Sequence, residues 1–131
     1  MKSPLHSVHA PKPIGPYSQA MRAGDFVFIS GQIGIDPASG KIKGKTAAEQ
    51  ADQVLKNLRA ILTAAGLTPE HVVKTTIFLA NMDDFGAVNE VYGDMFHEDP
   101  PARSTMQAAR LPMDALVEID VIAMRRPVTS P

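Results

Sequence analysis

The sequence predicts a single α+β domain in which a β-sheet is covered by two helices on one face. Segments with strand-like composition alternate with two segments whose apolar residues recur at helical spacing. Two amphipathic helices can cover only one face of a sheet, which gives a two-layer domain. The length of 131 residues is that of one domain, so we assign residues 1–131 to a single unit.

Composition excludes several classes of protein. Hydrophobic residues make up 44% and charged residues 21%, as in a globular protein. There are no cysteines, which excludes disulfides, thiolate catalysis and cysteine-ligated metals. The net charge of −1 gives no electrostatic basis for binding nucleic acid or an anionic membrane. With neither a signal peptide nor a membrane-spanning run, we expect a cytoplasmic protein.

The amino-terminal part predicts an arm and a hairpin. Residues 1–13 are rich in Pro, His and Lys and predict an arm, while residues 127–131 predict a loose tail. Residues 17–34 predict a hairpin, with Gly24 in the turn because glycine tolerates positive φ. Its second strand, residues 26–29, is apolar at every position, so both of its faces should be covered. Whether a short third strand precedes the first helix stays open.

Residues 46–65 predict the first helix. Thr46 and Glu49 form a capping box, and apolar residues follow on one stripe at helical spacing. Gly66 suits the left-handed residue that ends a helix, and Pro69 prevents the helix from resuming.

A strand at residues 71–80 and a second helix at residues 83–99 follow. The strand is rich in β-branched residues, and Asp83 is a suitable N-cap for the helix. The helical spacing predicts a buried face made of Phe85, Val88, Tyr92, Met95 and Phe96.

Two final strands, residues 103–110 and 116–126, are predicted to form a hairpin through residues 111–115. The predicted order is therefore β-β-α-β-α-β-β. The sheet face away from the helices mixes apolar residues with Ser, Thr and single charges. That face is too apolar for water and too polar for a dry core, so we infer a closed homo-oligomer.

Two charged residues on these strands are candidates for chemistry. Arg103 follows Pro-Pro-Ala, and its planar guanidinium suits a carboxylate; an ordinary surface ion pair is the alternative. Glu118 lies between Val117 and Ile119, where burial would raise its pKa and suit proton transfer. An outward-facing glutamate is the alternative there, because alternation along the strand allows it.

Other polar residues give weaker signals. His6 and His9 have no further ligands nearby, and no histidines and carboxylates fall at ligand spacing, so no metal site is expected. Ser30 and Gly31 end a buried strand, where a ligand or another backbone comes close. A Ser/His/Asp triad cannot be assembled from these residues.

Several segments resemble the RidA family, also called YjgF. The resemblance runs almost from end to end, between about Pro13 and Arg126, with the segments in the family's order. Its most specific part is the carboxyl-terminal signature "PARS", "ARLP" and "VEID". The segments are "IGPYSQA", "FISGQIG", "AAEQADQVLKNLRAILTAAGL", "VVKTTIFLANMDDFGAVNEVY", "PPARST" and "ARLPMDALVEIDVIA".

The resemblance implies a chorismate-mutase-like fold assembled as a homotrimer, with the sheets around a central barrel and sites between subunits. The implied activity is that of a hydrolase, a deaminase acting on reactive enamines and imines such as 2-aminoacrylate and 2-iminopropanoate. The products are a 2-keto acid and ammonia, in a role of metabolite damage control. Neither a metal nor an organic cofactor is implied.

The resemblance also assigns roles to individual residues. Arg103 is similar to the family's carboxylate-binding arginine, and Glu118 to its water-positioning acid. Thr105 stands where the bacterial archetype carries a cysteine, which removes any thiol role and leaves substrate preference open. The remaining implied substrate-binding residues are Tyr17, Ser30, Gly31 and Asn89.

Rival readings stay open at this point. The same arginine-lined cleft could hold a 2-keto acid as a regulatory signal without turnover. Some relatives are reported as endoribonucleases or translation inhibitors, which the balanced charge and absence of a basic stripe do not favour. A chaperone or structural trimer is a third alternative. The preferred imino acid and its source pathway are not readable from the sequence.

Overall fold

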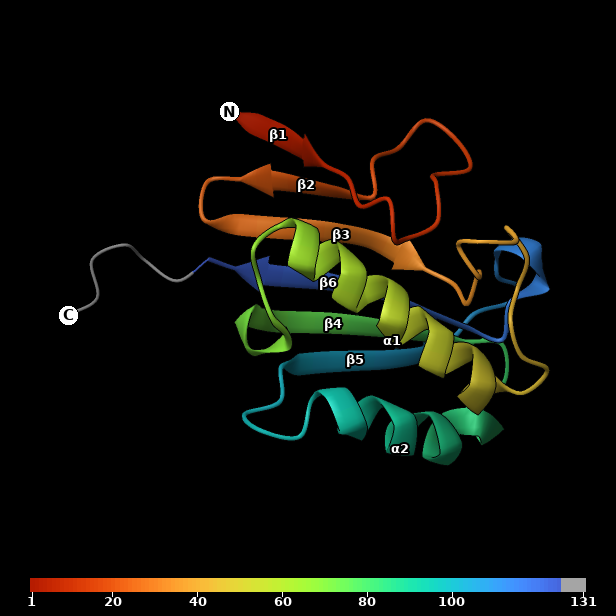
Figure 1. Cartoon of the computed structure of the whole chain (residues 1–131). Coiled ribbons are helices and arrows are strands. Elements are labelled where there is room, and N and C mark those ends of the chain that lie inside the picture. The colour runs from red at the N-terminus through yellow and green to blue at the C-terminus, as the bar shows by residue number, and fades with distance from the viewer. Residues whose placement is uncertain (126–131) are drawn as a thin grey trace.

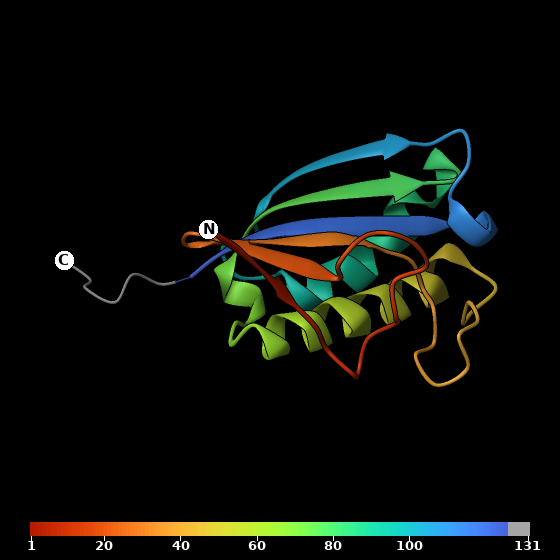
Figure 2. The same ribbon diagram turned by 90° about the horizontal axis from the view of Figure 1, so that it is seen from above.

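The computed structural model describes residues 1–125 and has two helices packed on one face of a six-stranded sheet (Figures 1 and 2). This arrangement confirms the predicted two-layer α+β class. The predicted tail, residues 127–131, and the last residue of the final predicted strand lie outside the described part. The elements are β1 Lys2–Leu5, β2 Ala20–Ala23, β3 Phe26–Gln32, α1 Ala47–Ala64, η1 Pro69–His71, β4 Val72–Leu79, η2 Met82–Asp84, α2 Phe85–Met95, β5 Ala102–Gln107, η3 Pro112–Asp114 and β6 Val117–Met124.

The strand order, β1-β2-β3-β6-β4-β5, corrects one sequence prediction. β5 and β6 do not form a hairpin, because β4 lies between them and pairs with both. β5 runs parallel to β4, to which it is connected through α2, while β6 is antiparallel to β3 and β4. A parallel pair requires a crossover connection, and α2 supplies it.

The amino terminus also differs from the prediction. Residues 2–5, expected in an arm, form strand β1 along the edge of the sheet, with Pro4 opposite Met21. An edge strand tolerates proline because one side of it needs no ladder hydrogen bond. The short strand left open before the first helix is reduced to one bridge between Ile35 and Ile42. The order is therefore β-β-β-α-β-α-β-β.

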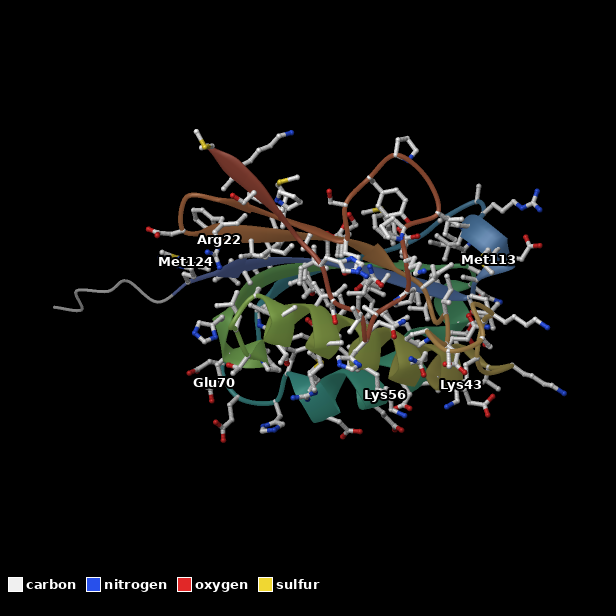
Figure 3. The ribbon with its side chains drawn as sticks, turned by 45° about the horizontal axis from the view of Figure 1, so that its top comes forward. Arg22, Lys43, Lys56, Glu70, Met113 and Met124 are labelled. Carbon is white, nitrogen blue, oxygen red and sulfur yellow. The ribbon has the colours of Figure 1, made fainter. Side chains whose placement is uncertain are left out.

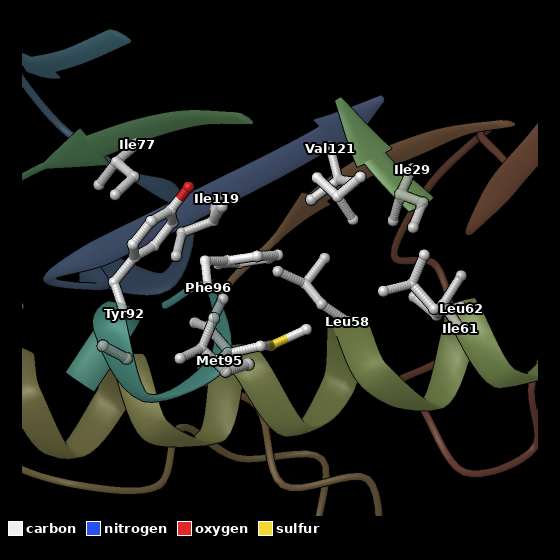
Figure 4. Packing of buried hydrophobic residues seen from close by; sticks show 14 of the residues in the cluster. Ile29, Leu58, Ile61, Leu62, Ile77, Tyr92, Met95, Phe96, Ile119 and Val121 are labelled. Atoms are coloured by element: carbon white, nitrogen blue, oxygen red, sulfur yellow. The ribbon is translucent and has the colours of Figure 1, made fainter. Parts of the chain in front are cut away.

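α1 forms as its local signals predict. Thr46 Oγ1 accepts a hydrogen bond from the Glu49 N–H, and the Glu49 carboxylate accepts from the Thr46 N–H. Gly66 has φ +75° just beyond the helix end. The apolar stripe packs onto the sheet and builds the core shown in Figure 4. Full burial of each leucine or isoleucine there contributes roughly 1.5–3 kcal/mol; those with no exposed surface include Leu58, Ile61, Leu62, Ile77 and Ile119.

α2 differs from its prediction at both ends, and it ends at Met95 instead of residue 99. The helix begins at Phe85, after the 3₁₀ turn η2, and Asp84 rather than Asp83 precedes it. Asn81 closes the turn, since its Oδ1 accepts from the Asp83 N–H. Phe85 was predicted to be buried but is 38% exposed, because its ring lies against Arg103 of the edge strand β5 and outside the core cluster. The other predicted residues, Val88, Tyr92, Met95 and Phe96, are buried.

The sheet face opposite the helices is open in a single chain (Figure 2). In β3, Val27 and Ile29 point into the core, whereas Phe26 and Phe28 are 41% and 44% exposed on the other face. Met106 of β5 adds to this apolar surface at 45% exposure. The sequence predicts that both faces of β3 are covered, but a single chain covers only one of them. The inferred oligomer, which would cover the other face, stays a prediction.

Charged side chains are spread around the periphery. Lys43, Lys56 and Glu70 extend outward from the helical side in Figure 3. Lys56 forms an exposed ion pair with Asp52 at 3.1 Å. Arg22 of β2 instead donates to the Ala65 carbonyl, at the end of α1, over 3.4 Å. A cation at this end of a helix is favourable because the last carbonyls carry partial negative charge.

Candidate active site

The predicted site residues fall into two groups on opposite faces of the sheet. Arg103 faces the helices, because it is in register with Thr75 of β4, whose side chain is buried against α2. Glu118 faces the open side, since its neighbours Val117 and Ile119 are completely buried against the helices. We call these groups the arginine half-site and the glutamate half-site.

The arginine half-site is built from β5 and α2. The Arg103 guanidinium carbon lies 5.0 Å from the centroid of the Tyr92 ring and 5.4 Å from that of Phe85. Tyr92 is itself fixed by a hydrogen bond of 2.7 Å between its hydroxyl and that of Thr75. Its ring stands between α2 and Ile77 of the sheet (Figure 4). Burial raises the pKa of Tyr92, so the phenol stays neutral beside the cation.

Within residues 1–125, Arg103 has no ion pair and no side-chain hydrogen bond to a protein group. Attraction to the two rings holds the guanidinium in place without using its N–H donors. Its N–H donors lie in the plane of the group and remain able to bind another partner. A carboxylate fits this fork through two parallel hydrogen bonds. The half-site therefore has the charge and the unused donors that suit a small organic anion.

Two other predicted site residues lie on the elements that hold Arg103. Asn89 is half-buried on α2, four residues after Phe85 and three before Tyr92, and therefore lies on the same helix face. Thr105 is two residues beyond Arg103 on β5 and shares its sheet face. The Thr105 hydroxyl is buried without a hydrogen-bond partner in the described chain. Both residues can therefore add polar contacts to an anion held by Arg103.

The glutamate half-site is a pocket of about 60 Å³ at the carboxyl end of β3. Tyr17, Gly31 and Glu118, three of the predicted site residues, line it. Gly31 and Glu118 are in tight contact, since a Cβ at position 31 would lie 2.5 Å from Glu118 Oε2. A side chain at position 31 would therefore displace the Glu118 carboxylate.

Glu118 has the electrostatics of a proton-transfer group. Burial raises the pKa of its carboxyl, and the negative charge of Asp120 raises it further. A carboxyl whose pKa is moved toward neutrality can both accept and donate a proton in one reaction cycle. Glu118 does face outward, as the alternation along β6 allows, but it is half-buried on that face.

Ser30 supports the pocket and does not line it. Its hydroxyl donates to the Ser18 carbonyl at 2.6 Å, and its N–H donates to the Gln19 carbonyl at 2.9 Å. These bonds fasten the segment carrying Tyr17 to the end of β3. The Tyr17 hydroxyl in turn accepts a hydrogen bond from the Ile14 N–H at 3.2 Å.

Gln19 was not identified from the sequence. It is 2% exposed, and its Oε1 accepts from the Ser7 N–H at 2.6 Å. Its Nε2 donates to the carbonyls of Ser7 and Pro11 at 3.1 and 2.8 Å. The amide thus binds the loop that forms one wall of the pocket. The only sequence signal was a glutamine inside "GPYSQA", which does not reveal its burial.

One chain cannot bring the two half-sites to one small molecule. β4 separates β5 from β6, so Arg103 and Glu118 are two strands, roughly 10 Å, apart across the sheet. They also point to opposite faces. A ligand that touches both groups therefore requires Arg103 from one chain and Glu118 from another.

Two negative findings apply to the part of the chain that the structure describes. Residues 1–125 contain no cluster of three histidines or acids placed to hold a metal ion. No helix in the same range has the length and apolar character needed to cross a bilayer.

The fold and the half-sites define a two-layer α+β protein that presents an arginine without an ion pair in residues 1–125 and a half-buried acid. The chain belongs to the family described as Endoribonuclease L-PSP, whose model matches residues 7–125. Membership confirms the resemblance to RidA (YjgF) proteins.

Named relatives agree with this assignment. A mouse protein, 2-iminobutanoate/2-iminopropanoate deaminase, is 48% identical over 94% of this chain and 91% of its own length. The crystal structure of Escherichia coli TdcF with bound serine superposes with a TM-score of 0.90 at 41% identity, covering 95% of this chain and 99% of that one. RidA from an Antarctic Psychrobacter species gives a TM-score of 0.90 at 38% identity, covering 93% and 98%.

Proposed function

We propose that this protein hydrolyses reactive imines of small 2-amino acids, such as 2-iminopropanoate and 2-iminobutanoate, to 2-keto acids and ammonia. The observation that carries the proposal is Arg103, a guanidinium held by two aromatic rings with its donors unused by the described chain. The mouse relative named as such a deaminase supports the same substrate class.

The chemistry follows from the charges of the two half-sites. Arg103 binds the substrate carboxylate and fixes the orientation of the neighbouring C=N carbon. Glu118 accepts a proton from a water as the water oxygen bonds to that carbon, and the proton is returned to nitrogen. Glu118 then moves the hydroxyl proton of the carbinolamine to nitrogen, and ammonia leaves as the C–N bond breaks and the C=O bond forms. Water and imine thus give keto acid and ammonia in balance, with no metal or organic cofactor.

The proposal includes a homotrimer in which each site lies between two chains. Arg103, Asn89 and Thr105 come from one chain, and Tyr17, Gly31 and Glu118 from its neighbour. The exposed apolar residues Phe26, Phe28 and Met106 are available for the contact between copies. Closed rotational symmetry would repeat the same composite site at every interface.

A single substitution tests the role of the anion receptor. In Arg103→Ala, kcat/KM for 2-iminopropanoate should fall at least about 100-fold, because a charge-paired contact is lost. Arg110→Ala is the matched control, because Arg110 is an exposed arginine whose only ion pair in residues 1–125 is with Asp114 at 3.0 Å. The imine is generated by a serine dehydratase, and release of pyruvate and ammonia is followed. Wild-type rates in Arg103→Ala would contradict the proposal.

The same purified protein distinguishes the proposed deaminase from the alternative functions. A regulatory 2-keto acid-binding protein would bind pyruvate but leave the decay of the imine unchanged. An endoribonuclease, the activity in the family's description, would cleave RNA at a rate that Arg103→Ala alters. The cytoplasmic location and the absence of nucleic-acid and membrane partners stay predictions.

A further inference from the structure

The pocket of the glutamate half-site has an apolar part of its lining, here called the chamber, that the proposed chemistry does not use. The chamber residues come from the loop before Tyr17, from the turn after β3 and from η3, and they share the pocket with the polar side chains of Lys12, Gln19 and Gln32. The aliphatic residues that line this chamber are Pro11, Pro13, Ile14, Ile33, Ile35 and Pro112. An apolar recess beside a reacting carbon suits the hydrocarbon side chain of a substrate.

The chamber is small. The whole pocket holds about 60 Å³, whereas an apolar cavity of roughly 150 Å³ accommodates benzene. A methyl or ethyl group therefore fits beside Glu118, and a benzyl group does not. Deletion of the side-chain carbons of one wall residue would bring the recess toward the size that holds an aromatic ring.

Buried amides hold two of the chamber walls in place. Asn57 of α1, 1% exposed, donates through Nδ2 to the carbonyls of Ile33 and Ile35 at 3.3 and 2.9 Å. Gln19 donates to the Pro11 carbonyl on the opposite wall. Because these carbonyls are fixed from inside the fold, the chamber cannot widen at low cost to admit a larger group.

We propose that this chamber receives the substrate side chain and that Ile33 sets its upper size, so that the site favours short aliphatic 2-imino acids over aromatic ones. The inference rests on the proposed function, because it deepens the account of that same site. Ile33 is therefore a specificity-determining residue. Arg103 and Glu118 bind the carboxylate and transfer protons in the same way for every substrate.

A pair of matched variants tests the role of Ile33. Ile33 and Leu111 are both 7% exposed and belong to the same apolar cluster, but Leu111 does not line the chamber. An L-amino-acid oxidase generates imines from alanine and phenylalanine, and kcat/KM is measured for each. Ile33→Ala should raise the phenylalanine-to-alanine ratio about 10-fold, the scale on which apolar pockets discriminate. Leu111→Ala should leave that ratio unchanged.

Ile33→Val removes only one methyl group and serves as a second variant in case Ile33→Ala does not fold. It should raise the phenylalanine-to-alanine ratio of kcat/KM by a smaller factor. An unchanged ratio in both Ile33 variants, or an equal rise in Leu111→Ala, overturns the inference.

Calorimetric binding of pyruvate and phenylpyruvate separates this inference from the proposed function. If the wild type turns over no imine, the deaminase proposal fails. Tighter phenylpyruvate binding in Ile33→Ala, relative to pyruvate, would still support the chamber. An unchanged binding ratio would overturn it.

Discussion

The two half-sites use different physical means to prepare a charged group. Arg103 is held by the faces of two aromatic rings, on side chains from α2. The Glu118 carboxylate occupies the space beside Gly31 that a side chain at position 31 would fill. The cation keeps its charge and its donors, whereas the acid is partly desolvated and its pKa rises. One half-site is thus suited to binding and the other to proton transfer.

The contrast predicts that neither half-site works alone. Arg103→Ala and Glu118→Gln should each be nearly inactive, with the second lowering kcat by about 10²–10⁴-fold. When the two variants are co-expressed, random assembly leaves about a quarter of the sites with both native groups, because each site draws on two chains. Activity should return to that fraction of wild type.

Steady-state rates on 2-iminopropanoate measure this recovery. The control mixes the two purified variants without dissociation, which should remain inactive. If co-expression restores nothing although mixed oligomers form, the half-sites do not meet between chains.

A methyl group at position 31 tests the steric side of the comparison. Gly31→Ala places a Cβ against Glu118, whose flexible side chain must move away. Displacement by about 1 Å can cost on the order of 100-fold in rate, so we expect a loss of that size in kcat. Stability should change less, because the group that moves is the end of a side chain.

Gly93→Ala in α2 is the matched control for Gly31→Ala. A Cβ at Gly93 meets nothing within 4 Å, so this variant should keep its activity and gain roughly 0.5–1 kcal/mol in helix stability. Denaturant unfolding and imine assays on both variants provide the comparison. Full activity in Gly31→Ala would show that the contact with Glu118 is unimportant.

The smallest expected effect is on stability as a function of pH. Because the folded pKa of Glu118 is raised, the native state binds its proton more tightly than the unfolded state does. Stability is therefore lost as pH rises from the ordinary glutamate pKa through the raised one. Glu118→Gln removes this loss and should be more stable than wild type at neutral pH, with the difference vanishing in acid.

Urea unfolding at several pH values and one fixed protein concentration measures this difference. A gap of constant size across the range, or a more stable wild type at neutral pH, would contradict the assigned desolvation of Glu118.

The sequence predicted most of the fold because much of the information is local. The capping box at Thr46 and the glycine at position 66 define α1 without help from the rest of the chain. The pairing of β5 was missed because strand composition does not distinguish a hairpin from a parallel crossover. The alternate apolar residues of β6 show that one of its faces is buried, but this pattern does not tell which strands lie beside it.

The candidate site was less accessible to sequence reasoning. Spacing alone left Arg103 and Glu118 with ordinary alternatives, and the resemblance supplied their roles. The register that places them on opposite faces depends on pairing with β4, which no local pattern specifies. The direction of the Ser30 hydroxyl and the burial of Gln19 also depend on contacts that are distant in sequence, with backbone groups of Ser18 and Ser7.

The threonine two residues beyond Arg103 has a consequence for chemical durability. Thr105 offers a hydroxyl where a cysteine would offer a thiol, and the sequence contains no cysteine. Peroxide, disulfide reagents and alkylating agents attack thiolates first. A site built this way has no thiol for these reagents to modify.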